Sequence, residues 1–105
     1  MYAVIRKLTY DKTRLAGGGE HQLAEFGAIH ERQPGFRGSI AIEADDGSTL
    51  VLNLWDSERD AMAGLSVLGP EVLRLVEPLL KEPAVLVGAG PVVENSLKLG
   101  SRGPR

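Results

Sequence analysis

The stretch that decides the fold is Leu50-Val51-Leu52-Asn53-Leu54-Trp55-Asp56-Ser57-Glu58-Arg59-Asp60. Its first half places side chains alternately on two faces, as a β-strand does, but both faces are mainly apolar. The strand ends at Trp55, the chain's only tryptophan, and Ser57 is a favourable N-cap for a helix. The stretch therefore predicts a buried strand over residues 49–55 that passes at once into a helix.

The remaining segments surround this strand in a recognisable order. Strand patterns occupy residues 2–10, 38–44 and 84–90, and helical patterns occupy residues 20–33 and the residues after Ser57. The second helical pattern is expected to fade near Gly69-Pro70, with a further helix over 71–81 that Pro78 kinks or shortens. Residues 11–19, which include three consecutive glycines, are expected to form a loop. We expect Ala61, Met62 and Leu65 to face inward.

Asp45-Asp46-Gly47-Ser48 separates two strand patterns and indicates a hairpin, so its flanking strands should pair antiparallel. The order strand, helix, strand, strand, helix, strand is that of ferredoxin-like split β-α-β folds. The sequence thus predicts an α+β fold with one four-stranded antiparallel sheet and helices on one side.

Composition sets the limits on function. The 105 residues are enough for one domain, expected over residues 1–95 and followed by a mobile tail over 96–105. Residues 1–95 hold 9 basic and 14 acidic residues, a net charge of −5, which argues against a nucleic-acid partner. Cysteine is absent, and no apolar run approaches the ~20 residues of a membrane span. We expect a cytoplasmic protein with no membrane partner.

Apolar residues on both faces of the strands indicate a homodimer. Leu50, Leu52 and Leu54 share the face opposite to that of Asn53 and Trp55, whereas a sheet with one wet face should alternate apolar and polar residues. Helices can cover only one face, so a second copy of the sheet is expected to cover the other. Each leucine left in water would forfeit roughly 1.5–3 kcal/mol.

Asn53 and Trp55 are the best candidates for a small-molecule pocket between sheet and helices. A buried amide without a partner costs roughly 1–3 kcal/mol, so Asn53 should bond to backbone, water or a ligand. Asn53 could equally tie a helix or loop to the sheet, and Trp55 taken alone is more typical of plain core, although the pair together favours a pocket. Arg6 shares the face of Val4 and Leu8 and could favour an anionic ligand oxygen. Alternatively, its head reaches solvent or an acid such as Glu43.

The two histidines cannot chelate one metal from a single helix. His21 and His30 are nine residues apart, so they lie on opposite faces. His30 falls in the last turn, where a cation suits the helix dipole, and a structural role is favoured over acid–base chemistry. We expect no metal site and no cofactor.

Two segments, Pro34-Gly35-Phe36-Arg37-Gly38 and Leu52-Asn53-Leu54-Trp55-Asp56-Ser57-Glu58-Arg59-Asp60-Ala61, resemble the antibiotic biosynthesis monooxygenase (ABM) family. The resemblance implies a dimeric α+β barrel, which agrees with the argument from the strands. That family includes cofactor-free monooxygenases of phenols and quinols, haem-degrading enzymes and many proteins of unknown role. Trp55 matches the tryptophan that faces substrate in several members. The haem-degrading branch ligates haem through a histidine after that strand, and no histidine follows Trp55, so this branch is disfavoured.

Two functions follow as hypotheses. The first is a cofactor-independent monooxygenase-like enzyme acting on a small aromatic phenol or quinol, with Asn53, Trp55 and Arg6 as candidate catalytic residues. The second is a non-catalytic, dimeric small-molecule-binding or stress-associated protein on the same fold. The missing acid–base pair favours the second hypothesis, and fold alone does not decide between them.

Overall fold

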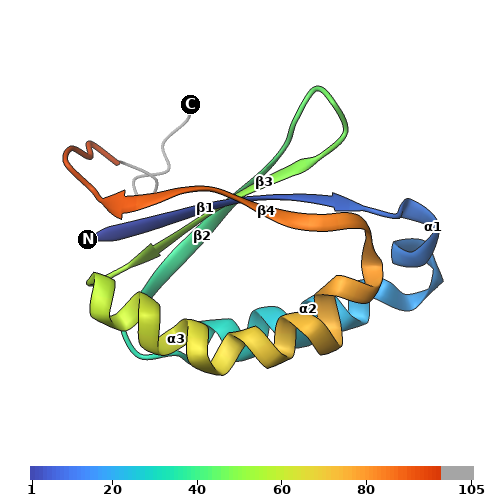
Figure 1. Cartoon of the computed structure of the whole chain (residues 1–105), viewed down its shortest axis with the longest axis horizontal. Helices are drawn as coiled ribbons and strands as arrows, with labels where there is room; N and C mark the ends of the chain where they lie inside the picture. Colours follow the sequence, from blue (N-terminus) through green and yellow to red (C-terminus); the bar gives the residue numbers. More distant parts are fainter. Residues whose placement is uncertain (98–105) are drawn as a thin grey trace, which may run out of the picture.

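The computed structural model of the chain describes residues 1–97 and shows one sheet with its two long helices on one side (Figure 1). The strands are β1 Tyr2–Tyr10, β2 Phe36–Glu43, β3 Thr49–Trp55 and β4 Leu80–Pro91. The helices are α1 Lys12–Arg14, α2 Glu20–Glu31 and α3 Glu58–Glu71, with π-helical turns η1 Leu15–Gly19 and η2 Val72–Val76 and a 3₁₀ turn η3 Glu77–Leu79. Within residues 1–97, no helix has the length and apolar character needed to cross a membrane.

The sheet has the predicted ferredoxin-like topology. Its strands lie in the order β2-β3-β1-β4, and every neighbouring pair is antiparallel. The predicted hairpin joins β2 to β3, and Gly47 takes a φ of 87°, the left-handed conformation that glycine adopts without strain. The Gly47 N–H donates to the Ala44 carbonyl over 2.9 Å and closes the turn. The α+β fold with a four-stranded antiparallel sheet is therefore confirmed.

The helical layer differs from the prediction in two places. Residues 12–19, expected as a loop, form α1 and η1, because the Asp11 carboxylate accepts from the Thr13 N–H over 2.9 Å and starts a helical turn. The predicted break at Gly69-Pro70 is also wrong, since α3 continues through Pro70 into η2. Buried residues on both sides of Pro70 hold the chain against the core there, and packing outweighs the lost backbone hydrogen bond.

The inward face of α3 was only partly predicted. Ala61 is fully buried, as expected, but Met62 is 47% exposed, and the buried stripe continues through Gly64 and Leu68. Ser57 caps α3 as predicted, accepting from the Asp60 N–H over 3.1 Å. The last strand begins at Leu80, earlier than expected, because the 3₁₀ turn that contains Pro78 ends the helical region just before it.

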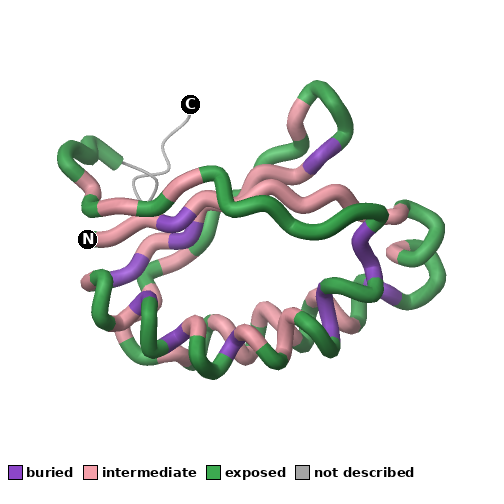
Figure 2. The backbone as a smooth tube through the Cα atoms, viewed as in Figure 1, coloured by how far each residue is buried: buried purple, intermediate pink, exposed green. Residues whose placement is uncertain are grey.

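The buried side chains form two clusters rather than one continuous core. The first holds Val4, Trp55, Ala61 and Leu68, and the second holds Leu75, Val76 and Leu80. Phe26 and Ile29 of α2 pack against both clusters. Figure 2 shows β4 exposed along most of its length. The helices therefore cover this edge strand less completely than the rest of the sheet.

Six described residues, 92–97, follow the last strand. The Val92 N–H donates to the Met1 carbonyl over 2.8 Å, one bond beyond the end of β4, and residues 92–97 form no helix or strand. Of the predicted tail over 96–105, residues 98–105 lie outside the described residues. The domain boundary at residue 95 therefore stays a prediction.

Candidate functional site

Asn53 and Trp55 face the helices, as the strand pattern predicted. Both are buried, at 6% and 2% exposure, while the leucines between and before them face the other way. Asn53 pairs with Val4 on β1 and with Ser39 on β2, and the Asn53 side-chain carbonyl accepts a hydrogen bond from the Ser39 hydroxyl. Asn53 is thus hydrogen-bonded to a neighbouring strand, whereas the sequence argument expected a helix, a loop, backbone, water or a ligand as its partner.

Trp55 is held tightly by aromatic rings and by a helix. Its ring packs edge-to-face on Phe36, with centroids 5.2 Å apart, and lies 5.6 Å from the ring of His30. A side chain at Gly64 of α3 would overlap the Trp55 indole, so only glycine lets the helix approach this closely. The indole accordingly belongs to the first core cluster as well as to the candidate site.

His30 is the polar residue that the sequence argument undervalued. It lies in the last turn of α2, and its ring centroid is 4.3 Å from that of Phe36 and 5.6 Å from that of Phe26. Burial, with a smaller contribution from the charge of Arg6, lowers the pKa of His30 to about 4. Burial thus opposes the charged form that the helix dipole would favour, and the structural role expected for His30 stays a prediction.

Arg6 lies in the middle of β1, on the same sheet face as Asn53. Its neighbours in the sheet are Val51 on β3 and Leu86 on β4. Because Val4 pairs with Asn53, Arg6 lies diagonally across from Asn53 on the same face. Burial lowers the pKa of Arg6, although a guanidinium stays protonated. Within residues 1–97 no carboxylate lies within ion-pair distance of it, and Glu43, the acid suggested as its partner, instead lies 3.9 Å from Lys12.

The position of Arg6 relative to the core is informative. Along β1, Val4 belongs to the first buried cluster and Leu8 packs against the second, so Arg6 separates the two. Leu86, its neighbour on β4, is 59% exposed, which leaves this part of the helix-facing side open toward the β4 edge. A half-buried cation thus lies between two apolar clusters, a combination typical of small-molecule sites.

The sequence argument missed Ser39 as the partner of Asn53, because the register of the hairpin differs by one residue from the predicted turn. Ala44 faces Ser48, so paired positions sum to 92 and Ser39 lies opposite Asn53, whereas a turn over residues 45–48 would give 93 and pair Ser39 with Leu54. No signal in the sequence was available for Gly64, because its contact with Trp55 depends on how α3 docks onto the sheet. The structure thus brings Arg6, Asn53 and Trp55 onto one face and adds Ser39 and His30.

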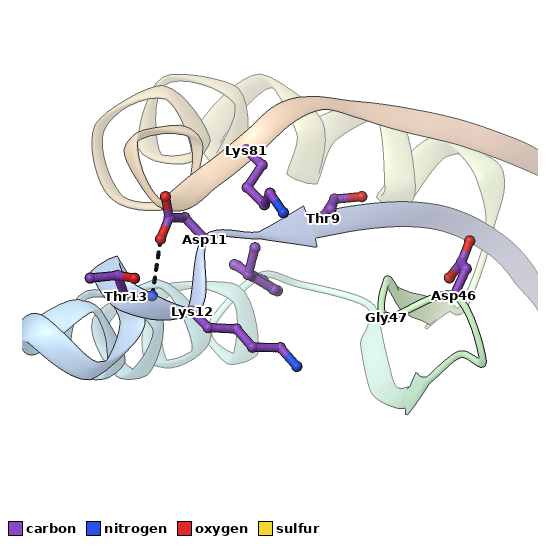
Figure 3. A pocket seen from close by; sticks show the side chains of 8 residues that line it. Thr9, Asp11, Lys12, Thr13, Asp46, Gly47 and Lys81 are labelled. Atoms are coloured by element: carbon purple, nitrogen blue, oxygen red, sulfur yellow. Dashed lines mark hydrogen bonds between the residues drawn. The ribbon is translucent and has the colours of Figure 1, made fainter.

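A separate hollow of about 560 Å³ lies at the far end of β1, away from these residues (Figure 3). The residues that line it are Thr9, Tyr10, Asp11, Lys12, Thr13, Asp46, Gly47 and Lys81. It mixes lysines with acids, and Lys7 pairs with Asp46 over 3.1 Å beside it. Hydrogen bonds from Ser48 keep the pKa of Asp46 well below its usual range. The hollow is polar and charged and does not include the predicted pocket residues.

Metal chemistry has no evident support in the part of the chain that is described. Within residues 1–97, no group of three or more His, Cys, Asp or Glu side chains is arranged to hold an ion. What the candidate site offers instead is one cation, one amide–hydroxyl pair, one neutral imidazole and a wall of aromatic rings. These groups can bind, orient and stabilise negative charge on a flat ligand.

An α+β domain with these side chains between its sheet and helices can be compared with known proteins. No family model matches the sequence, and no curated protein matches it. Solved structures do match across the chain, and they include proteins described as antibiotic biosynthesis monooxygenases, so the chain has the fold of those structures.

Three of these structures illustrate the likeness. One is an asparagine-to-alanine variant of SnoaB, a cofactor-independent oxygenase from Streptomyces nogalater, with a TM-score of 0.67, 17% identity, and coverage of 90% of this chain and 94% of that one. A proposed antibiotic biosynthesis monooxygenase from Nitrosomonas europaea has a TM-score of 0.69 and 15% identity over 90% of this chain and 100% of that one. A protein of unknown function, NE2512 from Nitrosomonas europaea, has a TM-score of 0.70 and 15% identity over 92% and 93%. At these identities the likeness shows the fold and leaves the activity open.

Proposed function

We propose that this protein is a cofactor-independent monooxygenase-like enzyme that binds a small phenol or quinol between its sheet and helices. The single observation that carries the proposal is Arg6, a half-buried guanidinium with no carboxylate partner within residues 1–97, on the same face as Asn53 and Trp55. A buried cation without a counter-ion is costly, and an anionic ligand oxygen would supply the missing charge.

The proposed chemistry uses the reactivity of the substrate itself. The anion of an electron-rich phenol or quinol can react with oxygen directly, so the protein needs to orient the ring, exclude water and stabilise the negative charge. Arg6 would stabilise the charge, the Asn53 amide would hold a substrate oxygen, and Trp55 would form a wall against the ring. The fold shared with SnoaB supports this assignment, because SnoaB is described as a cofactor-independent oxygenase.

Oxygen consumption with anthrone or a reduced naphthoquinone tests the proposal. We expect consumption above the rate with heat-denatured protein, and a loss of roughly tenfold or more in Asn53→Ala and in Arg6→Gln. Arg6→Lys, which keeps a positive charge, should retain more activity than Arg6→Gln, and Arg32→Gln on the exposed end of α2 should be unaffected. Equal rates in the wild type, Asn53→Ala and Arg6→Gln would remove these residues from the mechanism.

A second candidate function is supported by the packing of Trp55. Its 2% exposure and its contact with Gly64 fit a residue that stabilises the fold, and the Asn53 carbonyl already has a partner in Ser39. These contacts favour a small-molecule-binding protein without catalysis. Quenching of tryptophan emission by aromatic ligands, without oxygen consumption, would identify binding alone.

We also propose that the functional unit is a homodimer. One face of the sheet points away from the helices (Figure 1). It carries Ile40 and Ile42, at 39% and 52% exposure, beside the partly exposed leucines of β3. Packing this face against the same face of a second copy would remove the apolar side chains from water.

A further inference from the structure

One polar atom in the candidate site has no partner within the described residues. The Nε2 atom of His30 is buried and makes no hydrogen bond there. Buried polar groups in folded proteins nearly always have a partner, so an orphaned one calls for an explanation. The three rings around His30, those of Phe26, Phe36 and Trp55, offer contact surface but no hydrogen-bonding atom directed at Nε2.

Arg6 is the charged residue that acts on His30. Arg6 lies on the sheet face of Asn53 and Trp55, and the His30 ring lies 5.6 Å from that of Trp55, so both residues border the space between sheet and helices. The charge of Arg6 also contributes to the low pKa of His30. A neutral imidazole has one nitrogen that accepts a hydrogen bond, and a guanidinium only donates. A ligand group that binds to both residues must therefore accept from Arg6, and it donates to His30 when Nδ1 carries the imidazole proton and Nε2 is the acceptor.

We propose that Arg6 and His30 together bind one hydroxyl group of the ligand, with the guanidinium donating to its oxygen and the hydroxyl donating to His30 Nε2. This inference rests on the proposed function and narrows its substrate class to hydroxylated aromatics that bind in their neutral hydroxyl form, before the reaction forms the anion that Arg6 stabilises. A methyl ether has no proton for Nε2. A carboxylate satisfies Arg6 but sets its negative oxygen against the imidazole lone pair.

Three probes with the same ring system separate these cases: α-naphthol, its methyl ether and α-naphthoate. By calorimetry, the wild-type protein should bind the naphthol about tenfold more tightly than either relative, the factor expected for one hydrogen bond of ordinary strength. His30→Phe keeps an aromatic ring and should reduce this preference to about twofold or less, while His30→Gln, which restores an acceptor, should recover part of it. The nitrogen NMR shift of His30 Nε2 should change with the naphthol and not with the ether.

The control is His21→Phe, the exposed histidine on the same helix, which should leave the preference unchanged. If the wild type binds all three probes equally, or if His30→Phe keeps the preference, the role of His30 is overturned while an aromatic site remains. If no probe binds and no quinol is oxidised, the proposed function and this inference fall together.

Discussion

The contact between Gly64 and Trp55 shows how one missing methyl group positions a helix. Alanine normally stabilises a helix interior by ~1 kcal/mol relative to glycine. At residue 64, however, the new methyl would overlap the indole, so we expect Gly64→Ala to destabilise the protein by roughly 1–3 kcal/mol. Gly69→Ala in the same helix meets no atom within 4 Å and should be neutral or stabilising. Urea unfolding at one fixed protein concentration compares the two variants, and equal midpoints would contradict the packing argument.

The low pKa of His30 makes stability depend on pH. Burial lowers the pKa of His30 to about 4 in the folded state, whereas in the unfolded chain the imidazole has its ordinary pKa of about 6.5. Between these values the unfolded state binds more protons, so the contribution to the free energy of unfolding is complete above pH 6.5 and is lost as pH falls through 4. We expect about 1–2 kcal/mol, less than the full shift, because part of the ring reaches solvent.

Carboxylates also titrate in this window, so the test is a difference between two proteins. Thermal or urea unfolding of the wild type and of His30→Phe should give free energies whose difference changes with pH between 4 and 6.5. A difference that stays constant across this window would show that the histidine is not desolvated in the folded state.

At the scale of elements, the sequence predicted what local patterns control. The span of β3, the hairpin turn at Gly47 and the cap at Ser57 each depend on residues close together in the chain, and all three are confirmed. The continuation of α3 through Pro70 was not predictable in this way, since it depends on tertiary packing. The candidate site divides similarly: strand alternation placed Arg6 and Asn53 on one face, but the docking of α2 decides that His30 joins them.

Pro70 and Pro78 provide a matched test of that argument. In the interior of α3, Pro70 lacks the N–H that would bond to the preceding turn, so Pro70→Ala should stabilise the protein by roughly 1–2 kcal/mol. Pro78 lies in the first two positions of the short 3₁₀ turn, where the fixed φ of proline is well tolerated, and Pro78→Ala should change stability by less than about 0.5 kcal/mol. Unfolding midpoints at matched concentration measure both. Destabilisation by Pro70→Ala would mean that a kink there is needed for packing.

At the scale of the whole molecule, the two sides of the sheet have opposite environments. The helices cover one side of the sheet, as Figure 2 shows, and Asn53 and Trp55 lie on that side. The other side carries the partly exposed Ile40 and Ile42. The two small core clusters between sheet and helices are modest for a chain of this length. A second sheet packed on the open face would add the apolar burial that the single chain lacks.

Assembly through that face is tested by substitutions at two positions of similar exposure. Ile42→Lys puts a charge on the open sheet face, where the isoleucine is 52% exposed, and Val67→Lys puts the same charge on α3, where the valine is 49% exposed. A charge buried between two sheets must lose its hydration, so Ile42→Lys should raise the dimer dissociation constant by at least roughly tenfold, while Val67→Lys should not. Sedimentation velocity over a range of micromolar concentrations measures both constants. If the wild-type chain sediments as a compact monomer throughout that range, the open face has no second copy to cover it, and the dimer proposal fails even if the aromatic site binds its ligand.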